Sequence, residues 1–171
     1  MERYEAMRTP LSMSDLTTML AALGARVNRQ ATHTPVVLST EVNVKGDTLK
    51  VKGKETKGPV IVLLLFPTQT VGHFVCMWKD KGWHYFDPTG KPMGFYHVLP
   101  KFTHVQSNDV EYQGKYAVGR NGDGAEAGEM STCGRHCVVR AVYSDLDPDE
   151  YYRFMTQTGY SPDKLVTVLT E

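Results

Sequence analysis

The sequence predicts an α+β fold formed by a single domain that spans residues 1–171. Strand-forming segments rich in valine, isoleucine and aromatic residues come first, and segments with helix start signals come mostly last, an order typical of the α+β class. A chain of this length suits one well-buried domain. Its composition, 41% hydrophobic and 22% charged, is that of a globular protein.

The first predicted helix surrounds residues 16–23, where leucine and methionine side chains recur at helical spacing. Ser12 and Asp15 form a capping box before it, and Gly24 is expected to end it. Three short strands follow, with a turn at Lys45-Gly46-Asp47 between the last two. They cover Val36 to Leu38, Val42 to Val44 and Leu49 to Val51.

The run Val60 to Phe66 is continuously apolar, which predicts a strand that is buried on both faces in the interior of the sheet. Two further strands, Gly72 to Trp78 and Trp83 to Asp87, are joined by the turn Lys79-Asp80-Lys81-Gly82. These two strands are therefore predicted to form a hairpin.

The last third of the chain is predicted to hold a loop and three helices. Glycine and charged residues dominate residues 114–128, which predicts a mobile loop. The second and third helices each begin with a proline that follows a polar residue, which is a common start signal. The three helices are predicted over Thr132 to Tyr143, Pro148 to Gln157 and Pro162 to Leu169.

Charge and cysteine content argue against several classes of function. Nineteen basic residues balance nineteen acidic ones, which disfavours nucleic acid as the main partner. The longest apolar run is far shorter than the roughly 20 residues of a membrane span, and residues 1–9 lack a secretory signal, so we expect a reducing compartment. The three cysteines, Cys76, Cys133 and Cys137, form no paired knuckles, so we expect no disulfide framework and no structural zinc site. We also expect no metal and no cofactor.

The predicted hairpin places an imidazole beside a carboxylate. A turn centred near Asp80 sets His73 opposite or nearly opposite Asp87, and residues facing each other across a ladder share one face of the sheet. In such a pair the acid selects the tautomer of the imidazole and stabilises the imidazolium. Taken alone, His73 is more often a structural histidine of a sheet, and Asp87 before Pro88 is an ordinary turn residue. A third residue is therefore needed to predict a catalytic site.

A candidate nucleophile comes from the segment Ser131-Thr132-Cys133-Gly134-Arg135-His136-Cys137, which leads into an apolar helix. Cys133 is predicted at the helix amino terminus, where the macrodipole and free backbone N–H groups favour a thiolate and can hold an oxyanion. Gly134 permits close approach of the backbone. Cys137 lies one turn later and is predicted to pack in the core, and the spacing of Cys133, His136 and Cys137 is not that of a usual zinc site.

In their order along the chain these residues resemble the adenovirus-type maturation proteases and the Ulp1-like SUMO proteases. The resemblance covers roughly residues 60–143, and its matching pieces are Gly72-His73-Phe74, Tyr85-Phe86-Asp87-Pro88 and Thr132-Cys133-Gly134-Arg135-His136-Cys137. It implies the adenain/Ulp1-like fold, a central mixed β-sheet flanked by helices, with a papain-like site in permuted order. It also implies that His73 is the general base, Asp87 the orienting acid and Cys133 the nucleophile.

The chain departs from the family pattern at two positions. Phe74 stands where the family usually has tryptophan, and the place of the family's oxyanion glutamine, about six or seven residues before the cysteine, holds Glu126 and Ala127. Gln113, which follows a strand-like segment and precedes a glycine, is the candidate oxyanion residue. Asn121 and backbone N–H groups are the substitutes.

We therefore expect a cysteine endopeptidase that cleaves protein or peptide substrates at Gly-X or Gly-Gly sites. The resemblance to virus-encoded proteases further implies processing of capsid or core precursors, in a virion or the host cell cytoplasm, with an activating peptide as a further partner in some relatives. A protease for ubiquitin or a ubiquitin-like protein uses the same triad, and a YopJ-like acetyltransferase shares its order. The missing glutamine keeps a fourth alternative open, a catalytically inactive binding module.

Overall fold

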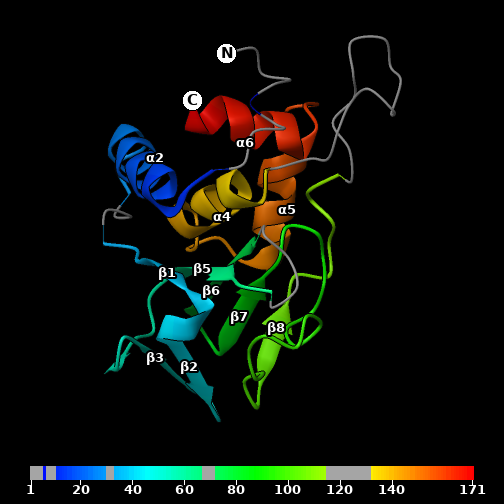
Figure 1. Cartoon of the computed structure of the whole chain (residues 1–171). Coiled ribbons are helices and arrows are strands. Elements are labelled where there is room, and N and C mark those ends of the chain that lie inside the picture. Colours follow the sequence, from blue (N-terminus) through cyan, green and yellow to red (C-terminus); the bar gives the residue numbers. More distant parts are fainter. Residues whose placement is uncertain (1–5, 7–10, 30–32, 67–71, 115–131) are drawn as a thin grey trace.

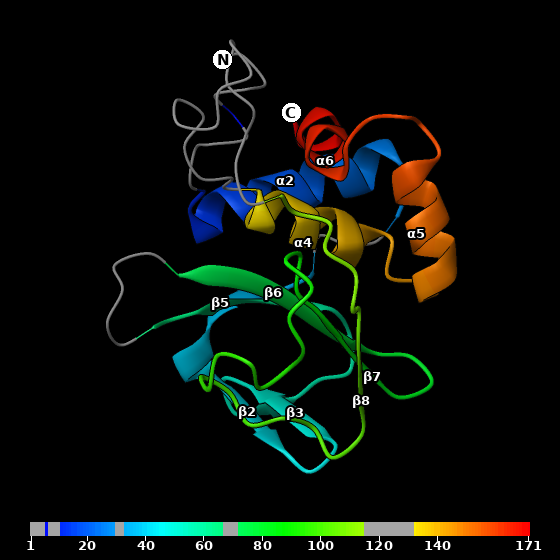
Figure 2. The ribbon, with the colours of Figure 1, turned by 90° about the vertical axis from the view of Figure 1, so that its right-hand side faces the viewer.

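The computed structural model describes residues 6, 11–29, 33–66, 72–114 and 132–171, which Figure 1 draws as a coloured ribbon. Except for Gly114, the predicted loop at residues 114–128 lies outside the described residues, as does Asn121. Figures 1 and 2 show helices above a five-stranded sheet and a three-stranded sheet below it. The α+β class is confirmed.

The described helices gather on one face of the main sheet, and all of the predicted ones form. They are α2 (Met13–Arg26), α4 (Cys133–Val142), α5 (Pro148–Thr156) and α6 (Pro162–Thr170). Ser12 caps α2 in a capping box with Asp15, and the side chains of Asp147 and Ser161 cap α5 and α6. Among the described residues, no helix combines the length and the apolar character needed to cross a bilayer.

The prediction that Gly24 ends the first helix is wrong. Helix α2 continues to Arg26, and Asn28 supplies the left-handed backbone conformation that ends it, with φ of 56°. The backbone N–H of Arg29 donates to the carbonyl of Gly24 at 2.8 Å, as in a Schellman motif. Asparagine tolerates this conformation well enough to take the place of glycine.

The main sheet has the strand order β1-β5-β6-β7-β8. Its strands are β1 (Val36–Leu38), β5 (Val60–Leu64), β6 (His73–Lys79), β7 (Trp83–Phe86) and β8 (Val105–Ser107). The sheet is mixed, because β1 pairs with β5 and β7 with β8 in parallel while β5, β6 and β7 are antiparallel. Strand β5 lies in the interior of the sheet as predicted, but it ends two residues before Phe66.

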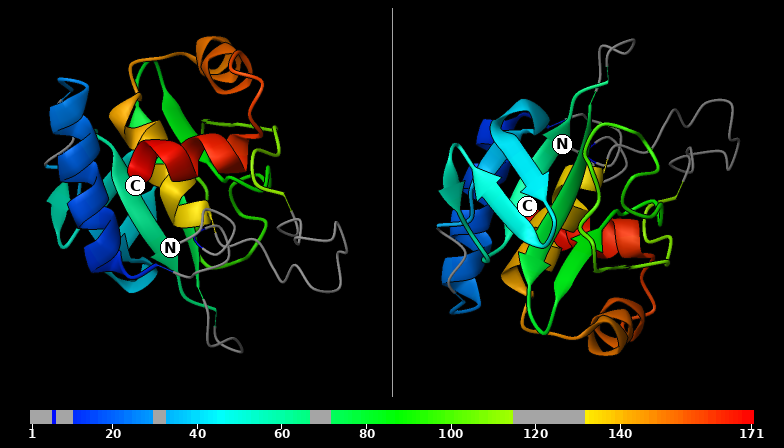
Figure 3. Two further views of the ribbon diagram at one scale, coloured as in Figure 1. Left: turned by 90° about the horizontal axis from the view of Figure 1, so that it is seen from above. Right: turned by 90° about the horizontal axis from the view of Figure 1, so that it is seen from below.

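The helices cover only one face of this sheet. The opposite face packs against the smaller sheet of β2 (Val42–Lys45), β3 (Thr48–Val51) and β4 (Lys54–Glu55) and against residues 93–102 (Figure 3). Side chains alternate along β6, so that Phe74, Cys76 and Trp78 join the core under the helices while Val75 and Met77 join the other core. Strands β4 and β8 were not predicted, because each has only two or three residues and no alternating pattern.

The hairpin of β6 and β7 forms with a different register from the predicted one. Cys76 pairs with Phe86 and Lys79 with Trp83, so Asp87 lies diagonally across from His73 instead of opposite it. The error is two residues, which preserves the face to which each side chain points. The carboxylate of Asp87 and the ring of His73 therefore still meet.

Gly72 places His73 at the start of β6, and its replacement by alanine is expected to destabilise the protein by about 1 to 3 kcal/mol. A Cβ atom there would lie 2.7 Å from the backbone oxygen of Leu64 and 2.6 Å from the Cδ1 of Leu63, so the strands would have to separate. Gly58→Ala is the matched control, because a Cβ atom at that position would have nothing within 4 Å. Its unfolding free energy, measured by chemical denaturation, is expected to stay within about 0.5 kcal/mol of wild type. Equal effects of the two replacements would contradict this account.

Candidate active site

Asp87 is held in one orientation by its neighbours at the end of β7. Its Oδ1 atom accepts hydrogen bonds from the backbone N–H of Thr89 at 2.8 Å and from the Thr89 hydroxyl at 2.7 Å. The side chain of Asn108 accepts from the backbone N–H of Asp87 at 2.9 Å and donates to its carbonyl at 2.8 Å. The carboxylate is fully buried. Thr89 and Asn108 therefore hold Asp87 in place independently of its bond to His73.

His73 is bound to this carboxylate through its Nε2 atom, which lies 2.8 Å from Oδ1 of Asp87. Burial lowers the pKa of His73, but hydrogen bonds to Asp87 and Cys133, together with the charges of these groups, outweigh burial and raise it to about 10. Burial likewise raises the pKa of Asp87, yet hydrogen bonds from His73 and Thr89 hold it below its usual value. The pair therefore favours an imidazolium beside a carboxylate.

Cys133 is the first residue of α4, and its partly buried thiol lies beside His73, where it contributes to the raised pKa of the imidazole. Since Nε2 of His73 is bound to Asp87, the remaining ring nitrogen, Nδ1, is the atom available to the thiol. The structure thus brings together the three residues His73, Asp87 and Cys133. An imidazole oriented by an acid and in contact with a thiol is the arrangement that activates a cysteine nucleophile.

The residues that follow His73 and Cys133 explain how the two side chains come so close. A Cβ atom on Gly134 would lie 3.3 Å from Cδ2 of Phe74 and 2.9 Å from Cδ1 of Leu16. The start of α4 therefore packs directly against β6 and α2, and the absence of a side chain on Gly134 permits this approach. Phe74, which stands where the resembling family has tryptophan, serves here as the packing surface beneath the helix.

The first backbone N–H groups of α4 point away from the helix without an intrahelical partner. Thr132 occupies the N-cap position, yet its side chain makes no capping hydrogen bond, and the first helical bond joins the N–H of His136 to the carbonyl of Thr132 at 2.9 Å. Within the described part of the chain, the N–H groups of Cys133, Gly134 and Arg135 have no hydrogen-bond acceptor. They can therefore hold negative charge that develops beside the thiol.

Gln113, the predicted oxyanion residue, is buried and lies beside the turn after Asp87. The backbone N–H groups of Tyr112 and Gln113 both donate to the carbonyl of Pro88 at 2.8 Å. The next residue, Gly114, donates its N–H to Oδ2 of Asp163 at 2.9 Å, and Oδ1 of the same carboxylate accepts from the hydroxyl of Thr132. The carboxylate of Asp163 therefore binds both Gly114, the residue after Gln113, and Thr132, the residue before Cys133.

Sequence reasoning missed several residues that shape this site. The ring of Tyr96 packs against that of His73, with centroids 5.4 Å apart, and its hydroxyl lies 3.3 Å from that of Thr89. Burial is the main cause that raises the pKa of Tyr96 to about 12, so the phenol stays neutral. Only the Asp87-Pro88-Thr89 turn offered a signal, because Asp commonly accepts the N–H of the second residue after it. Tyr96 and Asn108 reach the site from loops that carry no motif.

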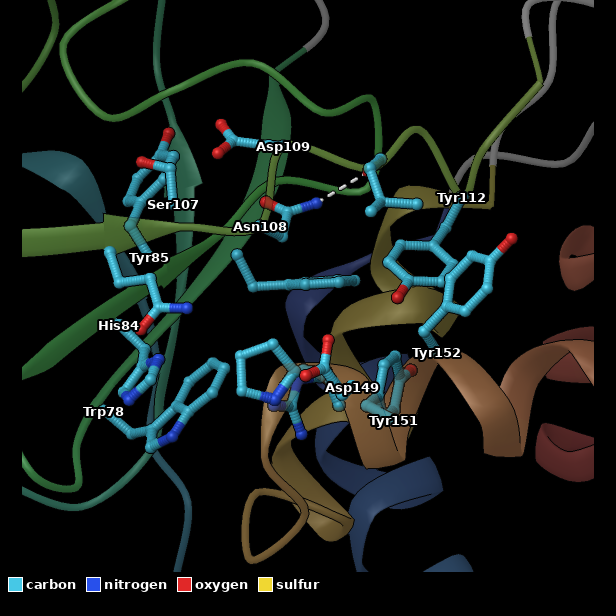
Figure 4. A pocket seen from close by; sticks show the side chains of 15 residues that line it. Trp78, His84, Tyr85, Ser107, Asn108, Asp109, Tyr112, Asp149, Tyr151 and Tyr152 are labelled. Carbon is cyan, nitrogen blue, oxygen red and sulfur yellow. Dashed lines mark hydrogen bonds between the residues drawn. The ribbon is translucent and has the colours of Figure 1, made fainter.

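A cavity of about 650 Å³ lies beside the other end of α4, and Figure 4 shows its lining. Trp78, Tyr151 and Arg140 form part of this lining, together with Asn108, whose side chain donates to the carbonyl of Val110 at 2.8 Å (dashed line in Figure 4). Arg140 is roughly two helical turns, or about 10 Å, beyond Cys133. The lining of the cavity does not include His73, Asp87 or Cys133, although Asn108 contacts both the cavity and Asp87.

Cys133, His136 and Cys137, whose spacing is not that of a usual zinc site, have separate surroundings in the fold. Cys133 lies beside His73, whereas Nε2 of His136 lies 2.8 Å from Oδ1 of Asp163 and Cys137 is fully buried in the core. Among residues 6, 11–29, 33–66, 72–114 and 132–171, no group of three or more His, Cys, Asp or Glu side chains is arranged to hold a metal ion.

Comparison of the chain with known protein families and with curated proteins finds no match. A function for the chain is therefore inferred from the geometry of the site itself.

Labelling of native thiols is expected to be confined to Cys133. Burial raises the pKa of Cys76 to about 12 and raises that of Cys137 well above its usual value, and both side chains are inaccessible. Iodoacetamide near neutral pH should therefore modify one thiol in the folded protein and all three after denaturation. Peptide mapping by mass spectrometry identifies the residue. Equal native labelling of Cys76 or Cys137 would show that the core is open.

Proposed function

We propose that the protein is a cysteine endopeptidase in which Cys133 is the nucleophile, His73 the general acid and base, and Asp87 the residue that orients His73. One observation carries this proposal: the ring of His73 bonds to the buried carboxylate of Asp87 and lies beside the thiol of Cys133. The N–H groups at the start of α4, which have no acceptor among the described residues, support it, since acyl transfer requires stabilisation of an oxyanion next to the nucleophile.

The chemistry proceeds in two halves. The Cys133 thiolate bonds to the peptide carbonyl carbon, the negative charge moves to the carbonyl oxygen, and the C–N bond breaks as His73 gives its proton to the leaving amine. A water molecule then gives a proton to His73 and its hydroxyl to the acyl carbon, the C–S bond breaks, and Cys133 is restored. Asp87 keeps the same tautomer and orientation of the ring in both halves.

The substrate class of this proposal follows from the resemblance in sequence. We propose cleavage at Gly-X or Gly-Gly sites in capsid or core precursors of a virus, in a virion or the host cytoplasm, where a free thiol stays reduced. A virion lysate whose capsid proteins keep the same termini when Cys133 is replaced by alanine would contradict this assignment.

A panel of substrates tests the reaction class. Short fluorogenic peptides with Gly-X sites are expected to be cleaved, and cleavage should stop when Cys133 is replaced by alanine. Turnover only of a folded ubiquitin or ubiquitin-like fusion would identify a deconjugating protease instead, and acyl transfer from a CoA donor to lysine would identify an acetyltransferase. Absence of all three reactions, together with slow labelling of Cys133, would leave a binding module and overturn the proposal.

A further inference from the structure

The carboxylate of Asp163, on α6, joins three segments that surround the start of α4. Its Oδ1 atom accepts from the hydroxyl of Thr132 at 2.5 Å and from Nε2 of His136 at 2.8 Å. Its Oδ2 atom accepts from the backbone N–H of Gly114 at 2.9 Å. Asp163, Thr132 and His136 are all buried. A buried carboxylate with three donors is held tightly, because each donor offsets part of the cost of removing its charge from water.

The first consequence concerns the helix N-terminus. A threonine at the N-cap usually accepts a hydrogen bond from one of the first N–H groups of the helix through its hydroxyl oxygen. Here the hydroxyl of Thr132 instead donates to Asp163 and makes no capping bond. The N–H groups beside Cys133 are thereby left available for a substrate oxyanion.

The second consequence concerns Gln113. Gly114, the residue after it, is bound to the same carboxylate as Thr132, the residue before Cys133. The carbonyl of Pro88 fixes the N–H of Gln113 from the other direction. Asp163 therefore links the segment that carries Gln113 to the segment that carries Cys133, although it is more than twenty residues from either in sequence.

We propose that Asp163 is a positioning residue that assembles the oxyanion-binding side of the active site by holding Thr132, His136 and Gly114 on one carboxylate. This inference rests on the proposed function. The contacts of Asp163 do not include His73 or Asp87. Asp163 therefore supports stabilisation of the oxyanion, whereas His73 and Asp87 activate the thiol. Loss of Asp163 should accordingly slow the chemical step without changing the reactivity of Cys133.

Asp163→Asn tests the proposal, because it keeps the shape of the side chain but places an N–H₂ group against at least one of the three donors. We expect kcat to fall about 10- to 100-fold, since the loss of one aligned oxyanion donor costs about 10²- to 10³-fold and displacement costs less. KM and the rate of Cys133 alkylation should stay within about twofold to threefold of wild type. Exchange of the Gly114 amide hydrogen should become faster.

Threonine variants keep the test independent of folding. Thr132→Val removes the donor and should lower kcat about 10-fold, whereas Thr132→Ser keeps the hydroxyl and should restore it. Thr167→Val is the matched control, because Thr167 is also buried on α6 but its hydroxyl donates to the backbone carbonyl of Asp163 at 2.7 Å. This control should leave kcat unchanged.

Three results would overturn the inference: unchanged Gly114 exchange in Asp163→Asn, equal effects of Thr132→Val and Thr167→Val, or a loss of kcat that merely follows a loss of Cys133 alkylation. A wild-type protein that cleaves no peptide would instead contradict the proposed function. Wild-type activity with an unaffected Asp163→Asn variant would contradict the inference alone.

Discussion

Replacement of Cys133 by alanine is expected to lower peptide hydrolysis by at least about 10⁴-fold, because it removes the sulfur that forms the acyl-enzyme. The thiol of Cys133 lies beside His73, and it is the one partly exposed thiol among the three cysteines, all of which lie in the described part of the chain. Binding of substrate should persist, since the surrounding backbone does not depend on the sulfur. Initial rates and equilibrium binding of an uncleaved peptide measure the two effects separately.

Cys137→Ala provides the matched control for this experiment. Cys137 lies one turn further along the same helix and is fully buried in the core beneath it. Its replacement should reduce stability by about 1 kcal/mol and leave kcat near that of wild type under conditions where the protein is folded. If Cys133→Ala retained substantial activity, or if Cys137→Ala abolished it, the nucleophile would have been assigned wrongly.

Replacement of Asp87 by alanine is expected to lower kcat/KM about 10²- to 10⁴-fold and to move the alkaline limit of activity to lower pH. The raised pKa of His73, about 10, means that the imidazolium persists until the pH approaches that value. Activity should fall as His73 loses this proton, because it can no longer protonate the leaving amine.

The direction of the change follows from the contributions to the pKa of His73. Asp87 raises this pKa through its charge and hydrogen bond, while burial lowers it and remains in the variant. The alkaline limb of the pH profile should therefore move down by about one to three pH units. The apparent pKa that this limb gives belongs to the coupled pair of Cys133 and His73 and not to either residue alone.

Asp47→Ala is the control for the Asp87 variant. Oδ2 of Asp47 lies 3.2 Å from Nδ1 of His104, but this carboxylate–histidine pair is exposed. Asp47 lies in the turn between β2 and β3, in the small sheet on the face of the main sheet opposite α4 (Figure 2). Its loss should leave both the rate and the pH profile unchanged. An Asp87→Ala profile that superimposes on that of wild type would show that Asp87 does not orient the base.

The position of the hairpin shows what pattern alone predicts about the site. Alternation and the turn at Asp80 predicted that His73 and Asp87 share one face, and this is confirmed by their hydrogen bond. The register was two residues in error because the chain turns through residues 80–82, with Lys81 and Gly82 at positive φ. An error of two residues leaves each side chain on the predicted face of the sheet, but it changes which residues lie directly opposite each other.

Local patterns also determined the helix starts, the interior position of β5 and the place of Cys133 at the start of α4, because caps, apolar runs and glycine positions act over a few residues. Tertiary structure alone decided that helices cover one face of the main sheet while a small sheet covers the other. It also decided that Asp163 joins Gly114 to Thr132 and that Tyr96 packs on His73. These contacts join segments that are distant in sequence, and they depend on how whole elements pack, which no short stretch of residues encodes.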